Sequence, residues 1–336
     1  MNYLEKILNV RNKTCKSIWF MRQAGRYLPE FRKIRSQNQN FIKLCLNSSL
    51  SSEITLQPIK RFDLDYAIIF SDILMVPFAL GQEVKFNKNK GPLLSKFNKK
   101  TFYKKNLKNF TKTLSPIYKA INKTRKKLQK EKPLISFVGA PWTLIIYMFS
   151  LKKNKDIFDK KSFKEKKHEI DQVLPDVLKF LSTHINNQIN AGADIIQIFD
   201  SWAGLIPDRR YLEYCYRPNR KLVEFCNKKN IPVICFPKGI KEKYLEFNKF
   251  VKPDGLNIDK DIDPVWAKKN LKDVVIQGGM NPKFLLENEV KIYGEAKKYL
   301  DTFKDIPYIF NLGHGLLPET KPEILEKLIK FVRNYK

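Results

Sequence analysis

Eight short apolar runs of four to six residues recur along this chain of 336 residues, and they constrain its fold more than any other feature. They lie at 17–21, 66–70, 134–138, 194–199, 232–236, 255–258, 273–277 and 308–312. Most are continuously apolar rather than alternating, which is typical of parallel strands covered on both faces. Helical patterns separate them, for example at 170–191, 211–229 and 290–303. This order predicts an α/β fold: a single (β/α)8 TIM barrel spanning residues 1–336, with a doubly wound sheet as the alternative.

The longest interval between predicted strands, from residue 70 to residue 134, has room for an extra hairpin or helices. A chain of 336 residues is within the range of barrel domains, which have about 250 residues and sometimes more than 400. A hydrophobic content of 43% supports a large core and argues against global disorder.

The chain is strongly basic, with 64 Lys and Arg against 34 Asp and Glu and a net charge of +30. Such a charge fits nucleic acid, an acidic membrane surface or an anionic substrate. The excess is mostly lysine, dispersed among many Asn and Ile, as AT-rich coding DNA produces. We interpret the lysine-rich stretches at 96–108, 123–132 and 152–167 as solvated surface, the second as an exposed helix face and the third as a mobile segment. No specific nucleic-acid partner is expected.

The cysteines and histidines predict neither disulfides nor a metal site. An odd count of five widely spaced cysteines, at 15, 45, 215, 226 and 235, favours free buried thiols in a reducing compartment. The three histidines have no metal-ligand spacing with them or with each other. No apolar run approaches the roughly 20 residues that span a bilayer. Residues 1–8 are typical of an amphipathic helix rather than a signal peptide, so we expect a cytoplasmic protein without membrane insertion.

Polar or flexible residues follow every predicted strand, where barrel enzymes place their active sites. Asp72 lies between two apolar runs, so its carboxylate is expected to be partly buried and functional. The alternative is a helix N-cap, a role that Ser71 fills equally well. Gly313 and Gly315 flank His314, which brings an imidazole close to a ligand or forms a phosphate nest. The other predicted strands are followed by Gly139, Ser201, Lys238, Asp259 and Gly278.

An arginine-rich segment follows the first predicted strand. Arg22, Arg26 and Arg32 lie close to Gln23 and Gly25. The guanidinium fork binds carboxylate or phosphate oxygens two at a time, and a glycine permits a tight turn or a close approach to a ligand. The segment therefore favours a site for a polyanion, with a solvated basic turn as the alternative.

These motifs together resemble the uroporphyrinogen decarboxylase family. Residues 19–31, WFMRQAGRYLPEF, are similar to its N-terminal signature, and further landmarks follow in the family's order at 69–74, 139–148, 199–204 and 311–315. The resemblance covers almost the whole chain. It implies a barrel enzyme, usually a homodimer and without cofactor or metal, that converts the four acetates of uroporphyrinogen III to methyls. The product, coproporphyrinogen III, belongs to haem biosynthesis.

The resemblance also implies roles for matched residues. Asp72 would accept hydrogen bonds from the pyrrole N–H groups and stabilise a cationic intermediate. Arg22 would bind substrate carboxylates and is a proposed proton donor. The other residues implied in substrate binding are Arg26, Arg35, Tyr147, Ser201 and His314. Gln23 shapes the pocket or is a structural amide, and Tyr147 is alternatively a core residue.

Three positions depart from the family pattern: Pro237, Gly279 and the segment at 152–155, where four residues with three lysines replace part of an acidic, glycine-rich loop. Two alternative functions remain. A zinc-dependent corrinoid or coenzyme M methyltransferase of the same superfamily needs a His-x-Cys motif, and none occurs here. A non-catalytic tetrapyrrole-binding protein would be expected to have lost Asp72 or the arginines.

Overall fold

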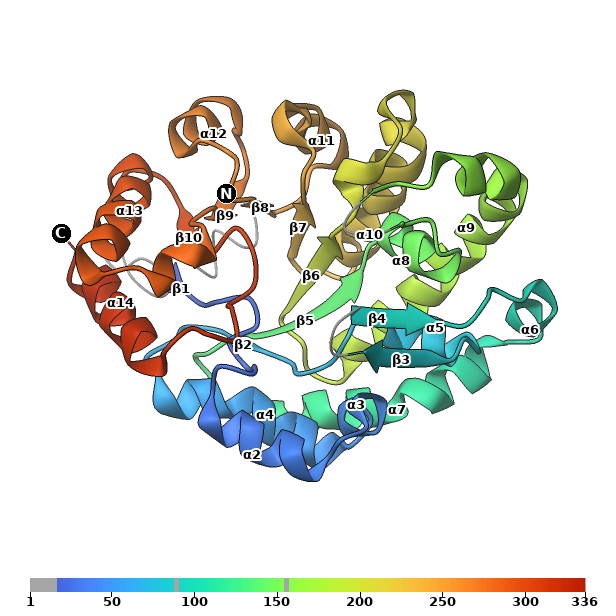
Figure 1. The fold of residues 1–336 in the computed structure, drawn as a ribbon, viewed down its shortest axis with the longest axis horizontal. Helices are drawn as coiled ribbons and strands as arrows, with labels where there is room; N and C mark the ends of the chain where they lie inside the picture. Colours follow the sequence, from blue (N-terminus) through green and yellow to red (C-terminus); the bar gives the residue numbers. More distant parts are fainter. Residues whose placement is uncertain (1–16, 88–90, 154–156, 336) are drawn as a thin grey trace.

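The computed structural model describes residues 17–87, 91–153 and 157–335. Eight parallel strands form one curled sheet in the order β1-β10-β9-β8-β7-β6-β5-β2 (Figure 1). Their bounds are β1 (Ser17–Ile18), β2 (Ala67–Ile68), β5 (Leu134–Gly139), β6 (Ile195–Asp200), β7 (Val233–Pro237), β8 (Gly255–Ile258), β9 (Val275–Gly278) and β10 (Tyr308–Phe310). Because this order contains no reversal, it excludes the doubly wound sheet and confirms the (β/α)8 barrel.

Helices cover the outside of the sheet (Figure 1). They are α2 (Pro29–Gln37), α3 (Phe41–Cys45), α4 (Ser48–Arg61), α5 (Met75–Ala79), α6 (Lys99–Tyr103), α7 (Leu107–Lys127), α8 (Pro141–Met148), α9 (Lys160–Asn190), α10 (Arg217–Asn227), α11 (Tyr244–Val251), α12 (Pro264–Asn270), α13 (Glu289–Thr302) and α14 (Pro322–Asn334). Many begin at signals in the sequence: Pro lies in the first turn of α8, and the Asn47 side chain accepts hydrogen bonds from two backbone N–H groups of α4.

Two helix predictions need correction. The helix expected at 170–191 begins ten residues earlier, because the Asp159 side chain accepts a hydrogen bond from the Ser162 N–H and Phe163 is buried. The prediction of a mobile surface segment is therefore wrong from Lys160 onward. The helix expected at 211–229 starts as a π-helical turn, Leu212–Tyr216, before α10.

The long interval between the second and third predicted strands contains the expected extra elements. An antiparallel hairpin of β3 (Val84–Asn87) and β4 (Gly91–Leu94) follows α5, and α6 and α7 follow the hairpin. These additions leave the order of the barrel strands unchanged.

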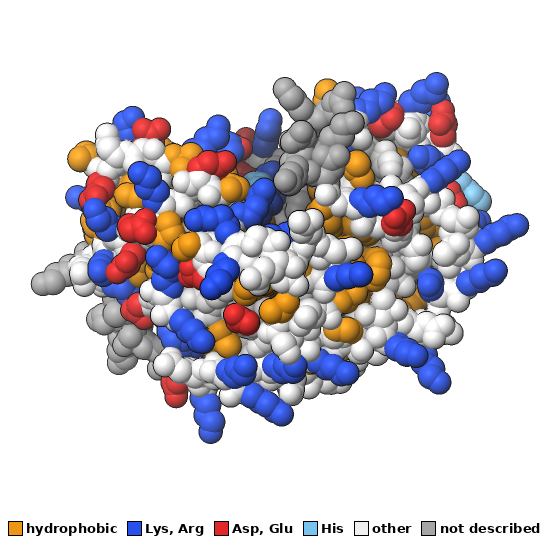
Figure 2. All heavy atoms as spheres, turned by 60° about the horizontal axis from the view of Figure 1, so that its bottom comes forward, with side chains coloured by type: hydrophobic (Ala, Val, Ile, Leu, Met, Phe, Trp, Pro, Cys, Tyr) orange, Lys and Arg blue, Asp and Glu red, His pale blue; other side chains and the backbone are white. Residues whose placement is uncertain are grey.

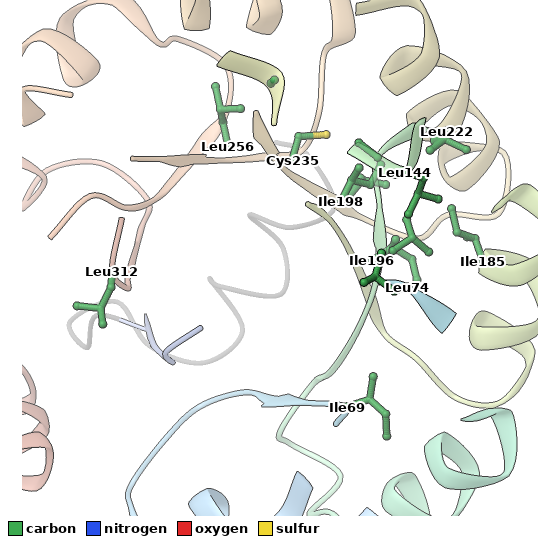
Figure 3. Close-up of a cluster of buried hydrophobic side chains, with 14 of the residues drawn as sticks. Ile69, Leu74, Leu144, Ile185, Ile196, Ile198, Leu222, Cys235, Leu256 and Leu312 are labelled. Atoms are coloured by element: carbon green, nitrogen blue, oxygen red, sulfur yellow. The ribbon is translucent and has the colours of Figure 1, made fainter. Parts of the chain in front are cut away.

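Each barrel strand is buried on both faces, which explains the continuous apolar runs. Alternate residues point inward, so that Ile135, Ile195 and Ile234 belong to one cluster inside the barrel. The intervening residues form the larger core under the helices. Figure 3 shows Ile196 and Ile198 of β6 in this outer core, beside Leu144 of α8.

The barrel interior also contains a layer of buried polar side chains. Gln277 accepts a hydrogen bond from the Trp19 indole at 2.9 Å and donates to Asn257 at 2.7 Å and to Gln197 at 3.3 Å. These residues come from β6, β8, β9 and the end of β1, so one amide joins distant strands. Hydrogen bonding offsets the cost of burying these polar groups.

The sheet closes between β1 and β2 through two side chains and one backbone hydrogen bond rather than through a regular ladder. The Asp65 Oδ2 atom accepts a hydrogen bond from the Ile18 N–H at 2.6 Å, and the Asp65 N–H donates to the Ile18 carbonyl at 3.0 Å. Gln23 spans the same junction: its Oε1 accepts from the Phe20 N–H at 3.1 Å, and its Nε2 donates to the Tyr66 carbonyl at 2.9 Å.

The surface charge is dispersed, as expected. Figure 2 shows Lys and Arg side chains scattered over the face that it presents, with Asp and Glu among them. Lys123, Lys126 and Lys127 lie exposed on the last turns of α7, which confirms a helix face for that part of the second lysine-rich stretch.

The other composition-based expectations are tested only in the described ranges. Four cysteines there, Cys45, Cys215, Cys226 and Cys235, are free and buried, as predicted. Cys15 and the amphipathic helix expected at 1–8 lie outside the described residues. None of the helices in the described part of the chain is both long and apolar enough to cross a membrane.

The junction between β1 and β2 generates a stability prediction. Gln23→Met keeps the approximate volume but leaves the buried Phe20 N–H and Tyr66 carbonyl without these partners. We expect the free energy of unfolding to fall by about 2–4 kcal/mol in urea titrations. The matched control is Gln172→Met at an exposed amide on α9, which should change the free energy of unfolding by less than about 0.5 kcal/mol. Equal stability of the two variants would contradict the closing role of Gln23.

Candidate active site

The segments that follow the carboxyl ends of the strands meet at one end of the barrel, here called the mouth. The Leu316 N–H donates to the Met21 carbonyl at 2.9 Å, which joins the segments after β10 and β1. The Gly204 N–H donates to the Lys238 carbonyl at 3.0 Å, which joins those after β6 and β7. A Cβ atom at Gly315 would collide with the Arg22 side chain, so this glycine lets Arg22 pack closely against the segment after β10.

Arg22 lies at the mouth in an uncommon backbone conformation, with φ of 63°. The turn needs a glycine three residues later, because a Cβ atom on Gly25 would lie 2.7 Å from the Arg22 carbonyl oxygen. The Arg22 side chain keeps solvent-exposed surface, yet the surrounding protein lowers its pKa through burial and through repulsion by Arg26. The charges of Asp72 and Tyr147 act in the opposite direction. Arg22, Arg26 and Asp72 therefore interact through their charges.

Asp72 follows β2 and begins the turn into α5. Its Oδ1 accepts a hydrogen bond from the Leu74 N–H at 2.8 Å. The sequence offered both Ser71 and Asp72 as acceptors for the backbone at the start of this turn, and Asp72 is the one that makes this bond. Burial raises the pKa of Asp72 to about 6, and this bond and the Arg22 charge only partly oppose the rise. At pH 7 to 8 the carboxylate is thus mostly ionised and incompletely compensated.

His314 is a neutral imidazole at the mouth. Burial, followed by the positive charges of Arg22 and Lys238, lowers its pKa to about 4. Its Nδ1 accepts a hydrogen bond from the Gly315 N–H at 2.8 Å, which assigns the proton of the neutral ring to Nε2. His314 can therefore donate one hydrogen bond to a ligand oxygen.

Tyr147 and Ser201 lie on the β5 and β6 side of the mouth. Tyr147 is half-buried on α8 and meets the Trp202 indole edge to face, with ring centres 6.1 Å apart. Ser201 is half-buried directly after β6. Its neighbour Asp200 is fully buried and accepts hydrogen bonds from Thr143 at 2.7 Å and Asn219 at 3.2 Å, so this carboxylate supports the barrel wall.

Gln23 and Arg35 differ from the other predicted site residues. Gln23 is buried, and both ends of its amide bond to backbone at the β1–β2 junction, which is the structural alternative left open by the sequence. Arg35 is half-buried on α2, donates to the Asn38 carbonyl and lies over the Phe41 ring at 5.8 Å. Its guanidinium thus has partners within its own segment.

Other polar residues after the strands hold the loops in place. The Asp259 Oδ2 accepts hydrogen bonds from the Gly239 N–H at 2.7 Å and the Tyr244 hydroxyl at 3.3 Å. Sequence reasoning also missed residues at the mouth, namely Trp202 and Lys152 beside it. Lys152 went unrecognised because a run of lysines predicts solvated surface. Within the described ranges, no group of three or more His, Cys, Asp and Glu side chains could hold a metal ion.

Cations, the ionisable carboxylate of Asp72 and the neutral imidazole of His314 meet at the mouth. This arrangement defines a barrel enzyme for an anionic substrate. The family model described as uroporphyrinogen decarboxylase (URO-D) matches residues 5–335. The chain belongs to this family.

Two relatives support the assignment over full length. The chain is 40% identical to the uroporphyrinogen decarboxylase of Orientia tsutsugamushi (strain Ikeda) over 339 residues, which cover 100% of this chain and 99% of the relative. It is 40% identical to that of Rickettsia felis, covering 99% and 97%. Among solved structures, a methyltransferase from Methanosarcina mazei has a TM-score of 0.76 and covers 98% of this chain and 97% of its own. At 17% identity, that likeness shows the fold alone.

The raised pKa of Asp72 predicts a stability effect with a definite sign. Since the pKa is higher in the folded than in the unfolded chain, the ionised carboxylate costs stability above about pH 6, and this cost vanishes below about pH 4. Asp72→Asn removes the charge and can keep the bond from Leu74. We expect the variant to be more stable than the unsubstituted protein by about 1–2 kcal/mol at pH 7.5, with a smaller difference at pH 4.5.

Urea titrations at the two pH values measure this difference. Glu319→Gln, at an exposed carboxylate, is the control and should change stability by less than about 0.5 kcal/mol at either pH. Lower stability of Asp72→Asn at pH 7.5 would mean that attraction to Arg22 outweighs the burial of Asp72.

Proposed function

We propose that this protein decarboxylates the four acetate side chains of uroporphyrinogen III to methyl groups, giving coproporphyrinogen III in haem biosynthesis. The observation that carries the proposal is the ionisable carboxylate of Asp72 beside the cations of the mouth. Eight substrate carboxylates need cationic partners, and the pyrrole N–H groups need an acceptor. Family membership and the 40% identity to named decarboxylases support the same activity.

The chemistry requires a place for the electrons of the breaking C–C bond. Proton addition to a pyrrole carbon makes that ring cationic. The bond to the carboxylate then breaks, CO2 leaves, and its electron pair flows into the ring. A second proton adds to the exocyclic carbon, and loss of the first restores the pyrrole, so each acetate consumes one proton. The substrate thereby supplies its own electron sink.

Asp72 stabilises the cationic ring in this proposal. An ionised carboxylate already buried in the protein interacts strongly with a developing positive charge, and no solvent reorganisation is needed. Arg22 and Arg26 bind carboxylates, and the Nε2 proton of His314 donates to a carboxylate oxygen or nearby water. The family resemblance alone implies the part of Arg22 as a proton donor. Tyr147, Ser201 and Arg35 complete the proposed binding set.

We further infer, from the family resemblance, a cytoplasmic homodimer in which residues 1–336 act as one barrel domain. Light scattering of the purified protein tests the dimer: a mass near twice 39.6 kDa is expected, and a mass of one chain would contradict it.

An anaerobic assay tests the activity directly. Purified protein receives uroporphyrinogen III without added metal or cofactor, and products are oxidised and separated by carboxylate number. Stepwise conversion from eight carboxylates to four is the expected result. Tight binding without CO2 release would indicate a tetrapyrrole-binding protein, and neither binding nor turnover would reopen the methyltransferase alternative.

Asp72→Asn should lower kcat by about two to three orders of magnitude, because it removes the charge that stabilises the cationic ring. Circular dichroism should show an unchanged fold, and turnover is measured in the same anaerobic assay. Turnover near that of the unsubstituted protein would contradict the assigned role.

Arg26→Ala should raise KM for uroporphyrinogen III about tenfold or more, through loss of a charge-assisted contact with a carboxylate. The matched control is Arg220→Ala, which removes an exposed arginine paired with Glu224 on the outer face of α10. Its KM should stay unchanged. If Arg26→Ala behaves like the control, Arg26 does not contact the substrate.

A further inference from the structure

Two lysines lie beside one tryptophan at the mouth. The Lys152 Nζ is 4.0 Å from the centre of the Trp202 ring, and the Lys238 Nζ is 6.0 Å from the same centre. Lys152 follows α8, Trp202 follows β6 and Lys238 follows β7, and all three are half-buried. We call these residues the Trp202 cluster.

Hydrogen bonds fix the backbone of this cluster. The Trp202 N–H donates to Thr143 Oγ1 at 3.1 Å, and the Trp202 carbonyl accepts from the Trp142 indole at 3.1 Å. The Lys238 N–H donates to the Asp200 carbonyl at 3.1 Å. These bonds hold the backbone from which the Trp202 indole projects. A cation over an indole face is attracted to the ring and keeps its charge.

The Trp202 cluster belongs to the β6 and β7 side of the mouth. The Trp202 indole meets Tyr147, and the positive charge of Lys238 acts on His314. In the closed order of strands, β7 is four places from β1 in either direction. Lys238 thus lies on the side of the barrel opposite the segment with Arg22 and Arg26.

A tetrapyrrole has carboxylates on all four sides. When one ring lies at Asp72, the carboxylates of the far side reach across the mouth. Acetates disappear one by one during four turnovers, whereas each ring keeps its propionate. A contact on the far side that serves every turnover must therefore recognise propionate.

We propose that Lys152 and Lys238, positioned by Trp202, form a second carboxylate subsite that holds propionate groups of the substrate on the side of the mouth opposite Arg22 and Arg26. This inference rests on the proposed function. The subsite orients the macrocycle in every turnover while taking no part in bond breaking. Lys152 lies in the segment where this chain departs from the family pattern, so its contribution is a property of this chain.

Binding of coproporphyrinogen III tests the subsite, since its only carboxylates are the four propionates. Lys152→Met and Lys238→Met should each weaken its binding about 3–10-fold, measured anaerobically as competitive inhibition and by equilibrium dialysis. KM should rise by one common factor for substrates with eight, seven, six and five carboxylates, with kcat nearly unchanged. Lys152→Arg and Lys238→Arg should restore binding, because arginine keeps both the charge and the contact with the indole.

Lys119→Met, which removes an exposed charge from the outer face of α7, controls for the loss of overall charge and should leave binding unchanged. Unaltered coproporphyrinogen binding in both methionine variants would overturn the subsite. A KM penalty that shrinks from eight carboxylates to five would also overturn it, because the lysines would then contact acetates. Absence of turnover by the unsubstituted protein would instead refute the proposed function, so the two failures are distinct.

Discussion

Closure of the barrel between β1 and β2 is the constraint on which the rest of the structure depends. These strands are separated by nearly fifty residues, and their junction is made by the Asp65 carboxylate and the Gln23 amide. The junction places the segment after β1, with Arg22 and Arg26, next to the segment after β2, with Asp72. Within the arginine-rich segment, Gln23 therefore bonds inside the barrel wall, whereas Arg22 and Arg26 lie at the mouth.

Burial and positive charge together set the electrostatics of the mouth. They lower the pKa of Arg22 and keep His314 neutral, while burial raises the pKa of Asp72. A polyanion relieves the repulsion among the cations, and a cationic intermediate compensates the buried carboxylate. The site is therefore suited to a substrate that arrives negatively charged and becomes locally positive during the reaction.

The fold could be predicted because parallel strands under helices need apolar residues on both faces, and eight such runs are visible in the chain. Strand ends were less accurate: the run at 17–21 forms a ladder only over Ser17–Ile18, because the Met21 N–H donates to the Asn311 side chain instead of a backbone carbonyl and the chain then turns. The start of α9 was missed because the lysine-rich sequence around Asp159 was interpreted as mobile surface, although Asp159 is the N-cap of the helix.

The sequence singled out site candidates whose residue types are rare in such positions, such as Asp72 between apolar runs and His314 between glycines, and the structure places both at the mouth. It could not separate carboxylates and amides that support the wall, such as Asp200 and Gln277, from those at the mouth. Both kinds of residue lie at or just after strand ends. Whether such a side chain faces the barrel wall or the mouth depends on the register of its strand.

The sequence by itself determined the α/β class, the number of strands, the family and the residue types available at the strand ends, because these depend on local pattern and composition. Only the tertiary structure decided that Gln23 closes the barrel and that Trp202 brings two lysines together on the side of the mouth opposite Arg22 and Arg26. Such relations arise when segments distant in the chain meet across a closed sheet, and burial there changes the pKa of each ionisable group.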